Sequence, residues 1–171
     1  RPTTTHDDPM WGTAGRIRDA LVGLGFLEAR PMPFVKGAHE THVDVANPLS
    51  AEESFLRTSV LESLERRAEH NLAQRIGDVR LFEVGAVFHR SGQAMPHEHT
   101  HLGIVLMGHR RPPHFSEPKP PTLDEWDAKA TAEAAARAAF PGEPITLAAG
   151  AENRLWELRN QGTVVGWVPR L

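Results

Sequence analysis

The segment from Val79 to Phe88 constrains the fold of this 171-residue chain more than any other. It is rich in β-branched and aromatic residues, a pattern typical of a strand in the interior of a sheet. Leu102 to Met107 has a similar composition and predicts a second buried strand. Together with the helical patterns described next, these two strands predict a globular α+β protein.

The N-terminal part of the chain carries a helical pattern between Thr13 and Phe26. Within it Ile17, Leu21 and Leu24 recur at positions i, i+4 and i+7, which places them on one face of a helix. Gly25 follows, and glycine commonly ends a helix because it adopts a left-handed backbone conformation at little cost. The sequence therefore predicts a first amphipathic helix here.

Two further helices are predicted. Ser59 and Glu62 have the three-residue separation of a capping box, and apolar residues at helical spacing follow them. The alanine-rich segment from Leu123 to Phe140 has one apolar side and predicts a third helix, which Pro141-Gly142 ends.

The remaining patterned segments predict strands and turns. Ala29 to Val35 contains two prolines and is expected to be an extended edge segment or a loop. His42 to Ala46 alternates polar and apolar residues and stops at Asn47-Pro48, which predicts a strand followed by a turn. Arg154 to Arg159 and Thr163 to Val168 predict a closing hairpin.

The segment from Arg110 to Pro121 contains five prolines and is expected to form a long extended loop. It is the one plausible linker in the sequence, so a boundary between two lobes is possible there. The length of the chain still favours a single domain that spans residues 1–171.

Composition excludes several classes of protein. The chain has no cysteine, which excludes disulfides, thiolate metal sites and cysteine nucleophiles and suits the cytoplasm. Its net charge of -3 argues against a broad surface for nucleic-acid phosphates. No apolar stretch approaches the roughly 20 residues that span a bilayer. The absence of an initial methionine indicates a piece of a longer chain.

Three histidines, His97, His99 and His101, alternate with other residues and would project from one face of a strand. Imidazoles arranged in this way are able to bind a divalent metal ion. The alternative is a solvated connection, because no carboxylate partner that would orient the rings is evident. We therefore expect no physiological metal site and keep these histidines as weak candidates.

No catalytic constellation is evident in the sequence. Asp124, Glu125 and Asp127 could hold a hard cation, but acidic residues at a helix start are explained by the helix dipole. The serines lack the surroundings of a nucleophile, and no glycine-rich phosphate loop is present. Four tryptophans are scattered along the chain and lack neighbouring basic clusters, so packing explains them better than base stacking. They are Trp11, Trp126, Trp156 and Trp167.

Three motifs occur in a fixed order, and together they carry a family resemblance. These are Asn47-Pro48-Leu49-Ser50, Leu56-Arg57-Thr58-Ser59, and the strand Phe82-Glu83-Val84-Gly85 that continues to Phe88. In this order and spacing they resemble the core of the bacterial phenylalanyl-tRNA synthetase β subunit. The resemblance covers nearly the whole chain and is weakest from Pro141 to Asn153.

The resemblance implies a catalytically degenerate class II aminoacyl-tRNA synthetase core, with an antiparallel β-sheet flanked by helices. It also implies that the first helix and the following edge segment meet another subunit. The interface candidates are Ile17, Leu21, Leu24, Phe26 and Pro33.

The same resemblance implies that this core has lost its chemistry. Catalytic relatives place a phosphate-binding arginine and an acidic residue where this chain has His89 and Ser91. A substrate-holding glutamate corresponds to Gly103. The family's third-motif arginine is expected beyond Leu171. We therefore expect no catalytic and no cofactor-binding residue in the chain, and inactivity of the chain alone.

The implied function is a structural and assembly role in phenylalanine-tRNA ligase, which attaches phenylalanine to its tRNA at the expense of ATP in protein biosynthesis. The expected partner is the catalytic α subunit, in an αβ heterodimer that dimerises to a heterotetramer. ATP and Mg²⁺ are expected in the α subunit, and contact with the tRNA is expected through the holoenzyme.

One alternative remains at this point. The chain could be an independent synthetase-like paralogue that binds an amino acid or a nucleotide in the remnant pocket, with His89 and Arg90 as its polar groups. Arg90 is one residue away from the expected position, however, and adjacent residues of a strand face opposite sides.

Overall fold

The computed structural model describes residues 8–92 and 95–169. The chain divides into two compact units. The terminal unit comprises the chain up to Gly25 together with the chain from Pro121, and the middle unit is Phe26–Pro120. The second boundary falls at the end of the proline-rich segment, and the assignment of a single domain stays a prediction.

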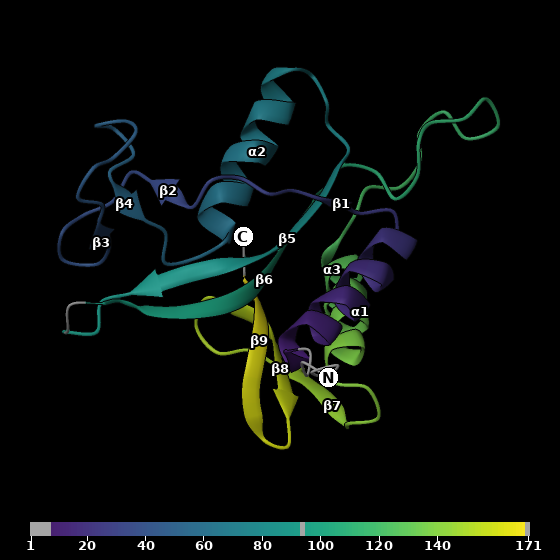
Figure 1. The fold of residues 1–171 in the computed structure, drawn as a ribbon. Coiled ribbons are helices and arrows are strands. Elements are labelled where there is room, and N and C mark those ends of the chain that lie inside the picture. The colour runs from purple at the N-terminus through teal and green to yellow at the C-terminus, as the bar shows by residue number, and fades with distance from the viewer. Residues whose placement is uncertain (1–7, 93–94, 170–171) are drawn as a thin grey trace, which may run out of the picture. The chain divides into compact units, whose positions relative to one another are not determined.

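The middle unit is built on a three-stranded sheet in the order β1-β5-β6. Its long pair is antiparallel and runs through eleven residues of each strand, Val79–His89 (β5) and His97–Met107 (β6). The short strand Leu27–Glu28 (β1) is parallel to β5, so the sheet is not wholly antiparallel. The helix Leu61–Ala73 (α2) packs against β5 and β6, as Figure 1 shows.

A second, small sheet precedes α2. Its strands are antiparallel, in the order β2-β4-β3, and each has two residues: Phe34–Val35 (β2), Val43–Asp44 (β3) and Phe55–Leu56 (β4). The backbone leaves β4 and enters α2 within a few residues, and this short connection contains Arg57.

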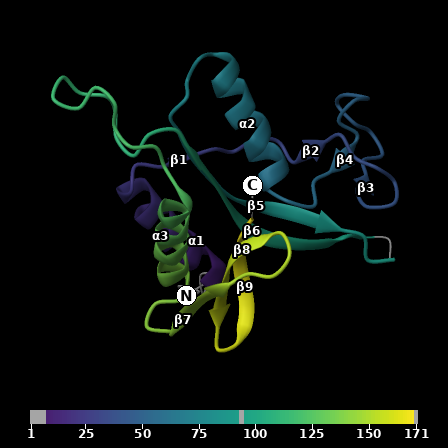
Figure 2. The same cartoon turned by 180° about the vertical axis from the view of Figure 1, so that it is seen from behind.

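The terminal unit contains two helices and a three-stranded antiparallel sheet in the order β7-β8-β9. The helix Pro9–Gly23 (α1) packs on the helix Glu125–Ala139 (α3), and α3 also contacts all three strands (Figure 2). The strands are Ile145–Ala149 (β7), Arg154–Asn160 (β8) and Thr163–Pro169 (β9).

Local sequence explains where the helices begin and end. The side chain of Asp8 accepts a hydrogen bond from the backbone N–H of Met10 at 2.9 Å, and Pro9 occupies the first turn of α1. The helix thus begins four residues before the start that the pattern from Thr13 predicts. Gly25 has φ 84°, which confirms the predicted left-handed residue after the helix.

The acidic residues at the start of α3 form a capping box. Asp124 accepts hydrogen bonds from the N–H groups of Trp126 and Asp127, and Asp127 accepts one from the N–H of Asp124. This geometry confirms that these carboxylates begin a helix, as expected, and it accounts for them without a cation.

Each unit has its own apolar core. In the middle unit the largest fully buried side chains include Phe82, Leu64 and Val87, all with no exposed surface. In the terminal unit Leu21 of α1 is fully buried, and Leu158 of β8 is 5% exposed. The core residues are therefore supplied by the helices and strands that the apolar patterns indicate.

The predicted α+β class is confirmed, and most predicted elements are present. The strand β6 begins at His97 rather than at Leu102, so the alternating histidines belong to the sheet. Three strands are not predicted by the sequence patterns, β1, β4 and β7. Within the described residues, no helix is long and apolar enough to cross a membrane.

Candidate functional site

The most densely connected group of polar side chains centres on a buried ion pair between Arg57 and Glu83. Arg57 follows β4 and is 2% exposed, and Glu83 lies in β5 and is 3% exposed. The guanidinium donates two hydrogen bonds to the carboxylate, from Nη1 to Oε2 at 2.8 Å and from Nη2 to Oε1 at 2.5 Å. The planar guanidinium matches the two oxygens of a carboxylate in this two-point arrangement.

Arg57 also joins three other parts of the middle unit. Its Nη1 donates to the hydroxyl of Ser63 in α2 at 3.2 Å, and its Nε donates to the carbonyl of Ala86 in β5 at 2.9 Å. Its backbone N–H donates to the carbonyl of Pro33, and its carbonyl accepts from the N–H of Phe88. The residue therefore ties the small sheet, α2 and β5 together.

Gly85 allows the ion pair to exist in this form. A Cβ at position 85 would lie 2.3 Å from Oε1 of Glu83 and 2.4 Å from Nη2 of Arg57. The Leu56-Arg57-Thr58-Ser59 motif and the Phe82-Glu83-Val84-Gly85 motif thus meet in space, because the arginine, the glutamate and the glycine of the two motifs form one cluster.

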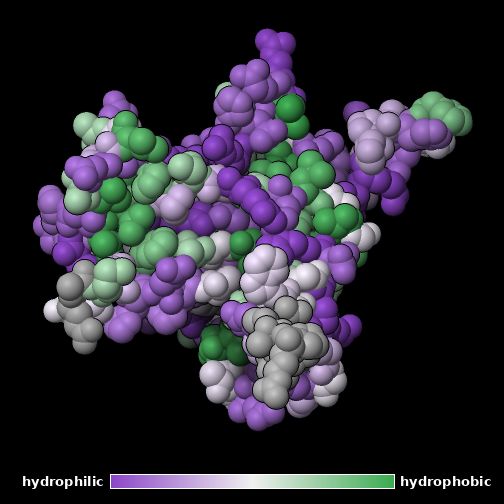
Figure 3. All heavy atoms as spheres, viewed as in Figure 1, coloured by the Kyte–Doolittle hydropathy of each residue, from purple (hydrophilic) through white to green (hydrophobic). Residues whose placement is uncertain are grey.

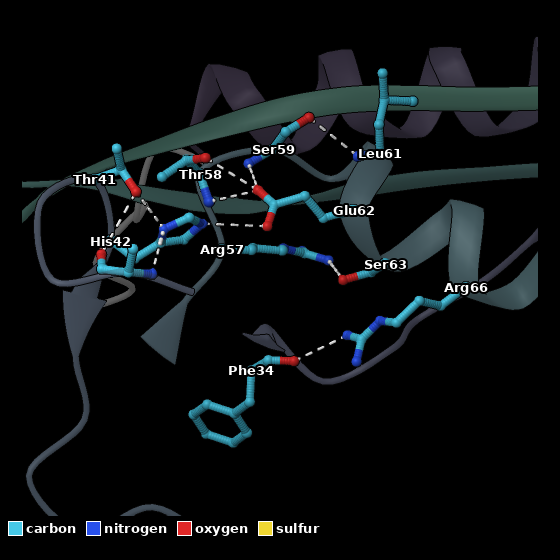
Figure 4. Close-up of polar contacts among 11 residues, drawn as sticks. Phe34, Thr41, His42, Arg57, Thr58, Ser59, Leu61, Glu62, Ser63 and Arg66 are labelled. Carbon is cyan, nitrogen blue, oxygen red and sulfur yellow. Dashed lines mark hydrogen bonds and ion pairs between the residues drawn. The ribbon is translucent and has the colours of Figure 1, made fainter. Parts of the chain in front are cut away.

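A second carboxylate organises the connection into α2. Oε1 of Glu62 accepts from the N–H of Thr58 at 3.0 Å, from its hydroxyl at 3.0 Å, and from the N–H of Ser59 at 2.8 Å (Figure 4). The hydroxyl of Ser59 accepts from the N–H of Leu61 at 3.2 Å. The helix start predicted from Ser59 and Glu62 is confirmed, although the hydroxyl bonds a different N–H from the one in a standard capping box.

His42 connects this carboxylate to the small sheet. Its Nδ1 accepts from the N–H of Ala38 at 3.3 Å and lies 2.7 Å from the hydroxyl of Thr41. Because a backbone N–H can only donate, Nδ1 is the unprotonated nitrogen of a neutral ring, and Nε2 carries the hydrogen. Nε2 lies 3.4 Å from Oε2 of Glu62, so the ring donates toward that carboxylate.

Arg66 of α2 makes a further connection that Figure 4 shows. Its Nη2 donates to the carbonyl of Phe34 in β2 at 3.0 Å, and its Nη1 pairs with the carboxylate of Glu53. One set of bonds joins Arg57 to Glu83 and Ser63, a second joins Glu62 to His42, Thr58 and Ser59, and Arg66 bonds Phe34 and Glu53. We term these neighbouring polar side chains the Arg57 cluster: His42, Arg57, Thr58, Ser59, Glu62, Ser63, Arg66 and Glu83. Such an arrangement holds elements in place.

Arg90, the alternative phosphate-binding candidate, and Gly103, where the resemblance implies a lost glutamate, are engaged in local pairing and in packing. Arg90 donates to the carbonyl of His42 at 2.6 Å and to the carboxylate of Asp44 at 2.5 Å. Gly103 is buried, and a Cβ there would lie 2.5 Å from Cγ2 of Val60 and 3.0 Å from Cδ1 of Leu64. No glutamate side chain fits at position 103 without displacing α2.

The histidines of β6 share one face of the sheet with His89 of β5. His89 is the register partner of His97, and side chains of partners point to the same face. The ring centroids of His89 and His99 lie 6.1 Å apart, and those of His97 and His101 each lie 6.4 Å from that of His99. Within residues 8–92 and 95–169, no three histidine, aspartate or glutamate side chains are placed to hold a metal ion.

Clustering of these rings affects the titration of His101. Burial, followed by the charges of His89 and His99, lowers the pKa of His101 below its ordinary value of 6.5. The folded state therefore binds fewer protons than the unfolded state once the pH falls below that value. Stability is lost in this range as the pH falls, because protonation favours the unfolded chain.

We therefore expect His101→Gln to weaken the pH dependence of stability. Urea unfolding at about pH 7.5 and at about pH 5.5 measures it, since a group with a depressed pKa contributes in that interval. The variant should lose less stability than the wild type between the two conditions. Equal losses would show that His101 titrates as it does in the unfolded chain.

The predicted interface residues have different surroundings in the structure. Ile17, Leu21 and Phe26 are buried, with exposed fractions of 7%, 0% and 4%, and Pro33 is half-buried. Leu24 is exposed. The buried side chains belong to the core of the chain, while the assignment of this region to a subunit interface stays a prediction.

The tryptophans are found in packing contacts and on the surface. The rings of Trp126 and Trp156 lie 5.5 Å apart, and the ammonium of Lys129 lies over both rings. The guanidinium of Arg154 lies 4.8 Å from the centroid of Trp167. Each of these contacts is internal to the terminal unit, which agrees with packing for three of the four residues.

The central ion pair was missed by reasoning from the sequence. Arg57 and Glu83 were recognised as parts of family motifs, but no role was assigned to either. A signal was present, because Arg57 directly follows the apolar pair Phe55-Leu56 and Glu83 interrupts a strand that is otherwise typical of a sheet interior. Charged residues in such segments are rarely buried unless they are paired.

Comparison with known proteins identifies a family. The family described as "Phenylalanyl tRNA synthetase beta chain CLM domain" matches residues 1–169 of this chain. The phenylalanine-tRNA ligase β subunit of Geobacter sulfurreducens is 33% identical over 132 residues, 70% of this chain and 16% of that protein. The β subunit of Xanthomonas axonopodis is 33% identical over 171 residues, 91% of this chain and 22% of that protein. The chain spans about a fifth of the length of these relatives.

Solved structures agree in fold. The pyrrolysyl-tRNA synthetase of Desulfitobacterium hafniense superposes with a TM-score of 0.66 at 14% identity and covers 95% of this chain and 58% of that one. An ATP phosphoribosyltransferase regulatory subunit/histidyl-tRNA synthetase from Bacillus halodurans gives 0.55 at 15% identity over 86% of this chain and 41% of that one. The fold is therefore of the class II synthetase type, and the chain belongs to the phenylalanyl-tRNA synthetase β-chain CLM domain family.

Proposed function

We propose that this chain is a structural, non-catalytic part of a phenylalanine-tRNA ligase β subunit and that it supports the catalytic α subunit. The observation that carries the proposal is the family match, which extends over residues 1–169. The relatives are named as β subunits, and such a name implies a complex with an α subunit.

The side chains of the middle unit support a structural role. Charged side chains of the middle unit are engaged within the fold, as Arg57 is with Glu83 and Arg90 is with Asp44. The packing of Val60 and Leu64 leaves no room for an acidic side chain at Gly103. These residues do not fit the binding of ATP and Mg²⁺, which we assign to the α subunit.

We further propose that α1 contributes to the contact with the α subunit. One side of the helix faces α3, and the other side leaves large apolar side chains exposed. Trp11 is 75% exposed and Val22 is 59% exposed, and the two lie eleven residues apart, on the same face of a helix. Leu24, just after the helix, is 48% exposed. Aromatic and aliphatic side chains of this kind are typical anchors of protein interfaces.

Sedimentation of the complete β subunit with its α subunit tests this proposal. We expect a stoichiometric αβ complex, dimerised to a heterotetramer, and aminoacylation of phenylalanine tRNA by that complex. Trp11→Asp combined with Val22→Asp should weaken assembly by at least about tenfold, since each change places a charge in a desolvated contact. Glu69→Lys on the exposed side of α2 is the matched surface control and should assemble normally.

Ligand binding separates this role from that of an independent enzyme. Calorimetry with ATP and with phenylalanine should show saturable binding to the complex and none to the present chain. Saturable binding of either ligand to the chain alone would contradict the structural role and favour an independent synthetase-like protein. We place the assembled ligase in the cytoplasm, where translation uses its product.

A further inference from the structure

Four histidines form a continuous face on the connected ends of β5 and β6. His97, His99 and His101 alternate along β6 and are exposed, and His89 of β5 is the register partner of His97. The ring of His99 lies in the middle of the group, because its centroid is 6.1–6.4 Å from the centroids of the other three rings. We term these four side chains the histidine face.

The polar half of β6, residues 97–101, lies at the edge of its sheet. In the strand order β1-β5-β6, its neighbour is β5. Figures 1 and 2 show the connected ends of the two strands projecting beyond α2. In Figure 3, viewed from the same side as Figure 1, hydrophilic residues are visible along the lower border of this end. Residues 97–101 are all exposed, so little apolar burial holds them against β5.

The facing end of β5, in contrast, is fixed to the rest of the middle unit. Val87 has no exposed surface, and the N–H of Phe88 donates to the carbonyl of Arg57 at 3.0 Å. Arg90, just after the strand, donates to the carboxylate of Asp44 at 2.5 Å. The polar half of β6 is therefore the part of this strand pair that is able to move.

Within the part of the chain that the structure describes, no carboxylate forms an ion pair with the histidine face. The histidines that are paired with carboxylates there are His39, His42 and His109. Glu98 alternates with the histidines along β6, so its side chain belongs to the opposite face of the sheet. Protons taken up by the histidine face therefore add positive charge that no ion pair offsets.

The elements that pack beside the histidine face do not neutralise it either. Gly85 is the register partner of His101, and the charged groups next to it are Arg57 and Glu83, which neutralise each other. Further along β6, α2 packs over the strand with the apolar side chain of Leu64. Other charged groups nearby are paired, Glu62 with His42, Arg66 with Glu53 and Arg90 with Asp44, and the later ones of α2 are exposed: Glu65, Arg67, Glu69 and His70.

Positive charge on the histidine face opposes the pairing of the two strands. Histidine ordinarily gains its charge between about pH 7 and about pH 5. Like charges directly opposite each other on paired strands are destabilising, and His97 lies directly opposite His89. The ring separations of 6.1–6.4 Å are shorter than the Debye length of about 8 Å at physiological ionic strength, so the repulsion is only partly screened.

The titration of His101 has the matching sign. Burial, followed by the charges of His89 and His99, lowers its pKa below the ordinary value of 6.5. A paired strand therefore takes up a proton less readily than a detached one. Pairing is fully stable above that value and is weakened as the pH falls below it, because protonation favours the detached form.

We propose that the histidine face makes the polar half of β6 a pH-sensitive segment, which pairs with β5 at neutral pH and detaches from it as protons are taken up at mildly acidic pH. The rest of the middle unit keeps its fold, because its fully buried side chains, such as Phe82 and Leu64, are separate from the histidine face. This inference goes beyond the assembly role proposed above and does not depend on it.

Amide hydrogen exchange of the complete β subunit, followed by mass spectrometry, tests the inference. Protection factors at about pH 7.5 and about pH 5.5 are compared, since they correct for the pH dependence of intrinsic exchange. The amides of residues 97–101 should lose protection by at least about tenfold, because one proton bound in excess by the open form changes the equilibrium about tenfold per pH unit. Amides of α2 should keep their protection. In about 1 M salt, where the Debye length is about 3 Å, the loss should be smaller.

Glutamine variants connect the effect to the histidine face. His97→Gln combined with His99→Gln and His101→Gln should keep residues 97–101 equally protected at both pH values. His99→Gln alone removes the central ring and should reduce the response, so the test does not depend on the triple variant. His70→Gln removes an exposed histidine of α2 and is the matched control, which should respond as the wild type does.

The contrary outcomes are distinct. Constant protection of residues 97–101 in the wild type would overturn the inference, and so would an undiminished loss in the glutamine variants. An equal loss of protection throughout the middle unit would show global unfolding instead of local detachment and would overturn it as well. None of these results concerns binding of the α subunit, so the structural role proposed above would stand.

Discussion

Replacing Arg57 by methionine should lower the free energy of unfolding of this chain by about 3–5 kcal/mol, the range found when one partner of a buried ion pair is removed. The cost arises because the carboxylate of Glu83, 3% exposed, would remain in the interior without its cation. The hydroxyl of Ser63 and the carbonyl of Ala86 would also lose their donors. Urea unfolding followed by circular dichroism measures the loss.

A double variant distinguishes the lost charge pair from lost packing. Arg57→Met combined with Glu83→Met removes both charges and keeps side chains of considerable volume. A buried ion pair replaced by apolar residues is often close to neutral in stability, so the double variant should recover at least about 2 kcal/mol relative to the single one. If the double variant is as unstable as Arg57→Met, the cluster contributes through its neutral hydrogen bonds and its packing, and the ion pair itself is not decisive.

Leu21→Ala should destabilise the chain by about 2–5 kcal/mol, the range for truncation of a fully buried leucine. Leu21 lies in α1, has no exposed surface, and belongs to the helix face that packs on α3. The loss combines the transfer of fewer apolar atoms from water with the cavity that remains. The same unfolding measurement on the chain, without any partner, quantifies the effect.

Leu24→Ala is the matched control, because it makes the same chemical change three residues later. Leu24 is 48% exposed, so its truncation should cost less than about 1 kcal/mol in the chain alone. In the assembled ligase we expect a different ranking of the two stability losses, because the exposed side chain of Leu24 is able to contact a partner subunit. If the two variants lost equal stability in the isolated chain, Leu21 would not hold the position that the structure assigns to it.

The helices of this protein illustrate what can be read from local sequence. The apolar spacing around Leu21, the pairing of Ser59 with Glu62, and the acidic start at Asp124 each predict a helix that is present. These signals can be read from local sequence because helix hydrogen bonds and caps link residues that are only a few positions apart. The main error was the first residue of α1, where Asp8 and Pro9 form a start signal that the periodicity from Thr13 did not include.

The strands were less completely predicted. The apolar composition predicts the long pair β5 and β6, but for the polar half of β6, His97 to His101, the sequence allows either a strand or a solvated connection. The backbone there is ordered by pairing with β5, residue by residue, whatever the polarity of the side chains. The two residues of β4 were missed because a strand of that length has no periodicity to detect.

Sequence by itself determined the α+β class, the three helices, the long strands and the family resemblance, because these depend on residue types at short spacings along the chain. Only the tertiary structure decided that Leu21 belongs to the core while Leu24 is exposed, and that Arg57 and Glu83, twenty-six residues apart, form a buried pair. It also decided that Arg111 pairs with Glu117 in the loop between β6 and α3, and that Phe115 of this loop is exposed. Burial and pairing depend on which elements pack against one another, and no pattern within a single segment contains that information.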